Sequence, residues 1–355
     1  MRWLDSVGMA QPLEIACDES GAEGEKLVGG NTDVFAHAGV GMDLDSAAGC
    51  IAELRARAPS PVTQYKANHI LREKHRAALK WLLGPAGPVL GHVHVFLTDK
   101  PFFAVGKVVD LLAEDHTPGI GLRQDPHTRA MAVDLYREGR AAFGAGRWTA
   151  FLDSFNYLLR AKNGQGITTS VEDAFRLVAD LRLAGGRAGE IMELLWRARP
   201  RVEAFRERLL ADPHVFPALD PLIPGIVNTV AYWGRGGRPV SVVHDRQTTL
   251  TDERIAQLRQ ILSERRLAGL RLVESTLDAR VQVADVLAGV ARKVASNELT
   301  GRGDPQLTAL LRPYVDAASI WGTTGAGRCW ASTRTRSCHG KYPTPPQSPQ
   351  NVTIE

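Results

Sequence analysis

Residues 13–21, LEIACDESG, combine a short apolar run with two adjacent carboxylates and a Ser-Gly turn. Leu13, Ile15 and Cys17 alternate with the other residues of the run, which predicts a buried strand. The glycine that ends the stretch tolerates the positive φ of a tight exit. Open α/β sheets bind ligands at the carboxyl ends of their strands. We therefore predict that Asp18 belongs to a functional site; a turn aspartate that caps the next segment is the alternative.

The composition is that of an ordinary globular protein. The chain has 355 residues, of which 44% are hydrophobic and 23% are charged, enough for one large domain or two modest ones. The net charge of +4 permits an anionic partner without requiring one. No apolar stretch approaches the roughly 20 residues of a membrane helix, and we expect no export signal in residues 1–11, which have no apolar core of signal-peptide length. Because the four cysteines form no paired framework, we expect a reduced, cytoplasmic setting without a membrane partner.

Two later strands are also predicted to end in an aspartate. Residues 91–100 form an apolar run that ends in Asp99, with Lys100 beside it. Residues 239–246 form another, which ends in Asp245. Three predicted strands therefore finish in carboxylates.

Other elements of the core are predicted around these strands. They are a returning strand at 32–41, a helix at 44–57, a strand at 62–66, a helix at 68–83, a helix capped by Thr251 and a strand at 270–275. Helical patterns dominate residues 101–238, which indicates an insertion into a core at 12–100 and 239–298. The arginines of this insertion have glutamates nearby, which favours a solvated charged face over a nucleic-acid surface. Residues 312–355 are expected to form a disordered tail.

Residues 281–291 predict an apolar helix in which Asp285 is the only charge. Burial of a lone carboxylate is costly unless the group is paired or bound to a metal. Gly289 would let another backbone approach this helix closely. A cap or a salt bridge to Arg292 or Lys293 is the alternative role of Asp285.

The three strand-end aspartates and Asp285 are expected to converge on one pocket. Clustered carboxylates either raise one another's pKa or hold divalent cations. An oxygen-only site suits Mg²⁺ or Mn²⁺, which activate phosphate esters toward hydrolysis. Lys66 and Lys100 would then contact phosphate or the transition state, with ordinary surface lysines as the alternative. The sequence contains neither a Walker phosphate loop nor a G-x-S-x-G elbow.

Taken together, these motifs resemble one bacterial family. They are the DESG turn at 18–21, the Lys66 segment, the strands ending in Asp99-Lys100 and Asp245-Arg246, and QVADVLAG at 282–289. The combination, which spans roughly residues 13–294, is similar to the family catalogued as domain of unknown function 3800, of the ribonuclease H-like superfamily. The resemblance implies an α/β fold: a ribonuclease H-like mixed sheet flanked by helices, with a large helical insertion.

The resemblance also implies a site and an activity. The residues that it marks as metal ligands are Asp18, Asp245 and Asp285, with Glu19 and Asp99 as supplements. One position departs from the family, which often has an acid two residues before Lys66, where this chain has Gln64. From the metal ligands that the resemblance marks, we expect a hydrolase of RNA or DNA phosphodiesters that depends on Mg²⁺ or Mn²⁺. The alternatives are a non-catalytic nucleic-acid or protein-binding module with a degenerate site, and a hydrolase of small phosphorylated metabolites.

Overall fold

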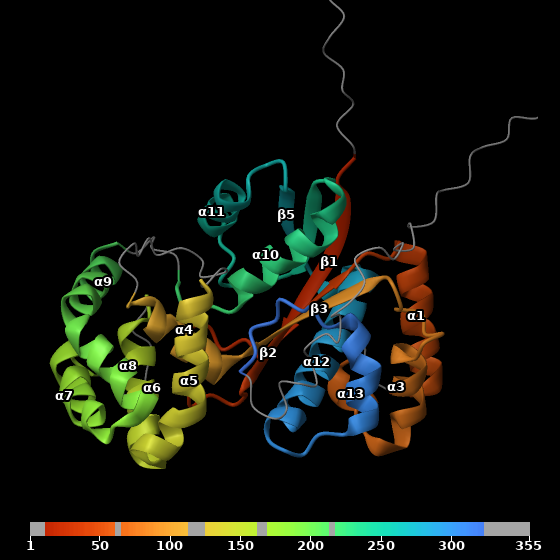
Figure 1. Cartoon of the computed structure of the whole chain (residues 1–355). Helices are drawn as coiled ribbons and strands as arrows, with labels where there is room; N and C mark the ends of the chain where they lie inside the picture. Colours follow the sequence, from red (N-terminus) through yellow and green to blue (C-terminus); the bar gives the residue numbers. More distant parts are fainter. Residues whose placement is uncertain (1–10, 61–64, 113–124, 162–168, 213–216, 323–355) are drawn as a thin grey trace, which may run out of the picture.

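The structure, a computed structural model, describes residues 11–60, 65–112, 125–161, 169–212 and 217–322 (Figure 1). These residues form an α/β protein around one five-stranded sheet of order β3-β2-β1-β4-β5. The strands are β1 (Leu13–Ser20), β2 (Val34–Val40), β3 (Val93–Asp99), β4 (Val240–Asp245) and β5 (Leu267–Val273). β2 is antiparallel to β1 and β3, whereas β4 is parallel to β1 and β5 is parallel to β4. The carboxyl ends of β1, β3, β4 and β5 therefore lie at one edge of the sheet.

The sheet is buried on both faces. One face packs against α1 (Leu44–Arg57), α3 (Arg76–Leu83), α12 (Ala279–Leu299) and α13 (Pro305–Leu311), and the other against α10 (Leu222–Trp233) and α11 (Asp252–Leu262) (Figure 1). Side chains of β1 alternate between the two cores: Ala16 joins the α12 side, while Ile15 and Cys17 join the α10 side. This alternation decides the face on which each polar residue of β1 lies.

The predicted insertion is helical and has a hydrophobic core of its own. Its helices are α4 (Lys100–Asp110), α5 (Pro126–Phe143), α6 (Ala145–Leu158), α7 (Val171–Leu181), α8 (Gly186–Arg197) and α9 (Arg199–Ala211). Phe151, Phe155 and Phe175 lie at the centre of this core. One helix that we assigned to the insertion, α10, packs on the sheet instead, through Ile223 and Ile226. None of the described helices is both long and apolar enough to cross a lipid bilayer.

Several predicted elements are confirmed, and one helix is interrupted. The helix at 44–57 and the returning strand of the first hairpin are present, and Thr251 caps α11. The predicted helix at 68–83 is divided into α2 (Ala67–Ile70), a 3-10 turn and α3. The break lets His69 and His75 stack with ring centroids 4.6 Å apart, although residues six positions apart face different sides of a continuous helix. Of the strand predicted at 62–66, residues 62–64 lie outside the described residues and residues 65 and 66 are not in a strand.

The prediction of a disordered tail is wrong for residues 312–322. This segment runs along β3, an edge strand, and makes backbone hydrogen bonds from Asp316 N to Val95 O (2.8 Å) and from Ile320 N to Leu97 O (2.9 Å). Trp321 is buried. The backbone groups offered by the sheet edge and the burial of Tyr314 and Trp321 explain why this segment is ordered. Residues 323–355 lie outside the described residues.

Gly289→Ala is expected to lower the free energy of unfolding by about 1–3 kcal/mol, since overpacking strains a close contact. An added Cβ at this position would lie 2.4 Å from the Cβ of Ala67. Chemical denaturation followed by circular dichroism measures the loss. Gly49→Ala in α1 is the matched control, because no described atom lies within 4 Å of its added Cβ. Helix propensity should make that variant more stable by roughly 0.5–1 kcal/mol; equal effects of the two substitutions would contradict the contact.

Candidate functional site

Asp18, Asp245 and Asp285 lie on the α12 face of the sheet, at its carboxyl edge. Because β1 and β4 are parallel and in register from Leu13 to Cys17, Asp18 and Asp245 follow as neighbours on adjacent strands. Each lies two residues after a member of the α12-side core, Ala16 on β1 and Val243 on β4, and therefore points to the same face of the sheet. Asp285 lies on α12, which packs across β1 and β2. Three of the four predicted aspartates are therefore brought together.

Burial and neighbouring carboxylates raise the pKa of Asp18 to about 9. The side chain is almost completely buried, and the negative charges that raise its pKa further are those of Glu19, Asp285 and Asp245. One stabilising contact opposes the shift, because the backbone N–H of Glu19 donates to Asp18 Oδ1 over 2.7 Å. The three aspartates are thus close enough to act on one another electrostatically.

The partner of Asp285 is Lys66. The Lys66 ammonium lies 2.5 Å from Asp285 Oδ2, and the two residues are 219 positions apart in the chain. Burial raises the pKa of Asp285, while the hydrogen bond and charge of Lys66 act against this rise. The close approach of Ala67 to Gly289 brings Lys66 to α12. The predicted partner Arg292 donates instead to Ser20 Oγ over 2.9 Å.

Asp245 is held by the backbone that follows β5. Its Oδ1 accepts a hydrogen bond of 3.0 Å from the backbone N–H of Ser275. The carbonyl of Asp245 is also held, because it accepts from His244 Nδ1 over 2.9 Å. Ser275 therefore holds the carboxylate of Asp245, and His244 holds its backbone.

Glu19 lies on the opposite face and does not join the three aspartates. Its Oε2 lies 3.6 Å from His244 Nε2, and Gln247 donates to Oε1. His244 Nε2 lies 3.3 Å from His37 Nε2, and His37 Nδ1 lies 3.0 Å from Thr229 Oγ1. Burial raises the pKa of Glu19, opposed by the charge of His244 and the hydrogen bond from Gln247.

Sequence reasoning missed this buried histidine network. The available signal was the alternation of side chains between the two faces of the sheet. Glu19 and His37 are directly paired between β1 and β2, and His244 lies in the neighbouring parallel strand. Since Asp245 O can only accept, His244 Nδ1 carries a proton. The contact between His244 Nε2 and His37 Nε2 requires a proton on one of these two nitrogens, and His37 Nδ1 shares a hydrogen bond with the Thr229 hydroxyl.

Asp99 and Lys100 have structural partners away from the three aspartates. Asp99 caps α4 by accepting from the backbone N–H of Phe102 over 3.1 Å and also accepts from the Tyr136 hydroxyl over 2.9 Å. Its pKa is raised to about 6 by burial, against these hydrogen bonds. In the register of the sheet, Asp99 lies two strands across from Asp18 and four residues further along its own strand. In regular strands this corresponds to a distance of about 16 Å between the two Cα atoms.

Lys100 is 1% exposed. Its ammonium donates to Thr32 Oγ1 over 2.8 Å and lies 3.4 Å from Glu23 Oε2. Burial lowers its pKa, and Glu23 opposes this change. These contacts place Lys100 inside the protein rather than at a substrate surface.

The donor chemistry of the three aspartates fits a hard divalent cation, because all of the side-chain donors are carboxylate oxygens. However, no three His, Cys, Asp or Glu side chains form a ready-made metal cluster in the described part of the chain. Binding of a cation would have to draw the aspartates together and move the Lys66 ammonium away from Asp285. Burial and the neighbouring carboxylates raise the pKa of Asp18, and a bound divalent cation would favour its ionised form.

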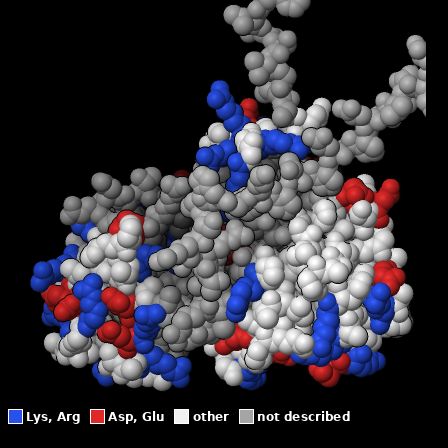
Figure 2. Space-filling model, turned by 45° about the vertical axis from the view of Figure 1, so that its right-hand side comes forward, with Lys and Arg blue, Asp and Glu red and all other residues white. Residues whose placement is uncertain are grey.

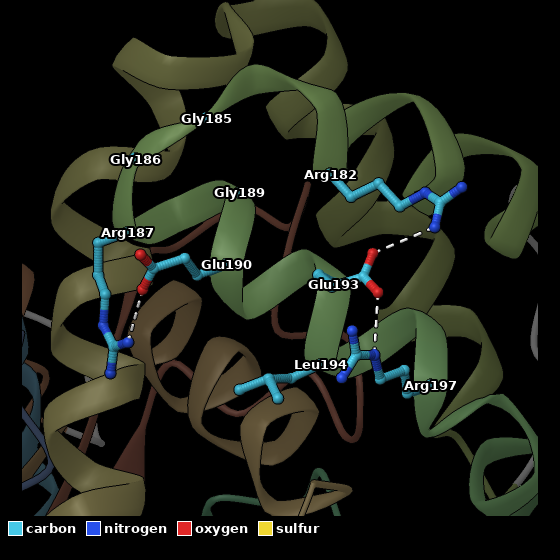
Figure 3. Close-up of a pocket in the computed structure, with 9 residues that line it drawn as sticks. All are labelled: Arg182, Gly185, Gly186, Arg187, Gly189, Glu190, Glu193, Leu194 and Arg197. Atoms are coloured by element: carbon cyan, nitrogen blue, oxygen red, sulfur yellow. Dashed lines mark hydrogen bonds and ion pairs between the residues drawn. The ribbon is translucent and has the colours of Figure 1, made fainter.

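The insertion has a pocket of about 520 Å³ beside α8, lined by three arginines and two glutamates (Figure 3). Arg187 donates to Glu190 over 2.9 Å, and Glu193 accepts from both Arg182 (3.1 Å) and Arg197 (2.9 Å). Figure 2 shows acidic and basic side chains interspersed on the visible face of the protein. The predicted local balance of arginine by glutamate is confirmed at this pocket, which we do not assign as the functional site.

Comparisons of the chain with protein families, with curated proteins and with solved structures found no match. Its function is therefore inferred from the geometry and chemistry of the site.

Asp18→Asn is expected to stabilise the metal-free protein increasingly as pH rises. The pKa of Asp18 is about 9 in the folded protein, above its ordinary value of 3.8. The protonated carboxyl therefore contributes stability that is fully present below pH 3.8 and is lost as pH rises through 9. An asparagine amide does not titrate. Thermal unfolding in EDTA at about pH 5, 7 and 9 measures the difference; a difference that stays the same at all three would contradict the assignment.

Proposed function

We propose that this chain is a nuclease of the ribonuclease H-like type: a hydrolase of nucleic-acid phosphodiesters that depends on Mg²⁺ or Mn²⁺. The observation that carries the proposal is the convergence of Asp18, Asp245 and Asp285 at the carboxyl edge of a mixed sheet. The resemblance to the domain of unknown function 3800 family implies a carboxylate on the first strand and another on the last long helix. Asp18 on β1 and Asp285 on α12 support this expectation.

In this proposal each polar residue of the site has a role. The three aspartates would hold the cation, which when bound polarises the phosphate ester and lowers the pKa of water. Ser275 orients Asp245 through its backbone N–H, and Arg292 restrains the Ser20 turn beside Asp18. Lys66, half exposed and adjacent to Asp285, would neutralise a non-bridging oxygen of the substrate phosphate.

Mn²⁺ is expected to raise the melting temperature of the wild-type protein by several degrees, because a ligand that binds only the folded state stabilises it by mass action. Asp285→Asn should remove most of this increase, together with any hydrolysis of single-stranded RNA or DNA. Asp45→Asn is the control, since Asp45 is an exposed residue in the first turn of α1. A metal-induced increase of the same size in all three proteins would overturn the assignment of the site.

A second candidate function is a non-catalytic nucleic-acid or protein-binding module on the same fold. One observation favours it: the Lys66 ammonium already neutralises Asp285 at 2.5 Å. A permanent ion pair of this kind would leave only two carboxylates for a cation. The position of Gln64, where the resembling family often has an acid, lies outside the described residues.

Lys66→Gln separates the two candidates. In a hydrolase, removal of the competing ammonium should increase the affinity for Mn²⁺ in calorimetric titration, while kcat/KM for an oligonucleotide falls roughly tenfold or more through the loss of a charged contact to phosphate. In a binding module, neither the wild type nor the variant should bind Mn²⁺ at millimolar concentration. Increased affinity with unchanged kcat/KM would exclude Lys66 as a phosphate contact and leave the metal site standing.

A further inference from the structure

A second pocket lies beside the histidine-containing face of the sheet, between the core and the insertion. Its volume is about 520 Å³, within the range of small-molecule sites. The polar side chains that matter here are Lys26, Arg160, Thr248, Thr249, Thr251 and Arg254, and we call this cavity the threonine pocket. Gln247, which contacts Glu19, immediately precedes its first threonine.

The wall of the threonine pocket is held in place by Asn156 of α6. This buried side chain accepts from the backbone N–H groups of Leu27 (3.1 Å) and Val28 (3.2 Å) through Oδ1. Its Nδ2 donates to the carbonyl of Glu25 over 2.8 Å. The loop that follows β1 is thus bound to the insertion, and the pocket is preformed rather than dependent on a ligand for its shape.

The acidic residues that line the pocket have partners within the protein. Both carboxylate oxygens of Glu25 lie within 3.2 Å of the backbone nitrogen of Ala161, which donates to them. Glu23 accepts from Asn31 N over 2.8 Å and pairs with buried Lys100. Asp220 Oδ1 accepts from the backbone N–H of Leu222 over 3.0 Å. These contacts satisfy carboxylate oxygens of the wall within the protein, while the charges of Glu25 and Asp220 act on Arg160 and Arg254 respectively.

The basic residues have donors that remain for a ligand. The Arg160 guanidinium has five N–H groups. Among the described residues, it donates one hydrogen bond, to Asn156 Oδ1 over 3.2 Å. Lys26 is exposed at the rim, and Arg254 comes from the first turn of α11. Cations from three separate elements, with threonine hydroxyls between them, are suited to the oxygens of a phosphate group.

We propose that the threonine pocket binds the phosphomonoester of a nucleotide, either free or at the end of a nucleic-acid strand. A phosphomonoester carries a charge of about −1.5 to −2 at pH 7, which matches several converging cations better than a single diester charge does. The choice of a nucleotide as the organic part rests on the proposed nuclease function. Binding itself requires neither a divalent cation nor catalysis.

The experiment is calorimetric titration of the full chain in EDTA with adenosine 5′-monophosphate, and with one oligonucleotide carrying either a 5′-phosphate or a 5′-hydroxyl. Wild-type protein should bind the monophosphate saturably. Because a hydrogen bond to a charged group contributes about 1.5–3 kcal/mol, Arg160→Gln should weaken this binding roughly tenfold or more. Lys26→Gln should weaken it less, and Arg160→Lys should restore part of it.

Arg187→Gln is the matched control, because this arginine also lines a pocket but is paired with Glu190 (Figure 3). Its affinity should equal that of the wild type. Tighter binding of the 5′-phosphorylated strand than of the monophosphate would identify a strand end as the ligand, and equal binding a free nucleotide. Both outcomes support the proposal.

Three outcomes would overturn it: no saturable binding of the monophosphate by folded wild-type protein, displacement of the bound monophosphate by the 5′-hydroxyl strand as effectively as by the 5′-phosphate strand, or affinity unchanged in both Lys26→Gln and Arg160→Gln. The exposure of Lys26 makes its variant informative even if Arg160→Gln fails to fold. Because EDTA removes divalent cations, these results are independent of the Mn²⁺ experiment. Failure of the metal site and failure of the threonine pocket are therefore distinguishable.

Discussion

The alternation of side chains along β1 is the constraint on which the rest of the structure depends. β1 is the central strand of the sheet and is buried on both faces, so adjacent residues must point into different cores. Asp18 therefore faces α12, where it meets Asp245 and Asp285, whereas Glu19 faces α10 and meets His244. Two carboxylates that are neighbours in the chain thus belong to different polar networks.

The two networks compensate buried charge in different ways. On the α12 face, burial and the charges of Glu19, Asp285 and Asp245 raise the pKa of Asp18, and the Lys66 ammonium lies against Asp285. This arrangement leaves net negative charge that a cation would offset. On the α10 face, Gln247 donates to Glu19 Oε1, and Oε2 lies 3.6 Å from His244 Nε2, which contacts His37. The first network is suited to ligand binding, and the second holds the backbone of Asp245 beside it.

The insertion contributes a wall to the core, including one side of the threonine pocket. Its arginines near α8 are paired with glutamates, in agreement with a solvated charged face. Its contact with the core is specific, because Asn156 binds the loop after β1 and the hydroxyl of Tyr136 donates to Asp99. These contacts explain why Asp99, which ends a strand at the same edge as Asp18, serves α4 and α5 rather than the aspartate cluster.

The sequence by itself determined the three strands that carry Asp18, Asp99 and Asp245 and the apolar helix around Asp285, because hydrophobic periodicity and capping are local properties. Only the tertiary structure decided which charges meet. The pairing of Lys66 with Asp285 depends on the close packing of Ala67 against Gly289, far apart in the chain. Strand order separates Asp99 from Asp18 by two strands, and the edge of β3 orders residues 312–322. Long-range contacts of this kind leave no periodic signal in a single sequence, since they depend on how distant elements pack.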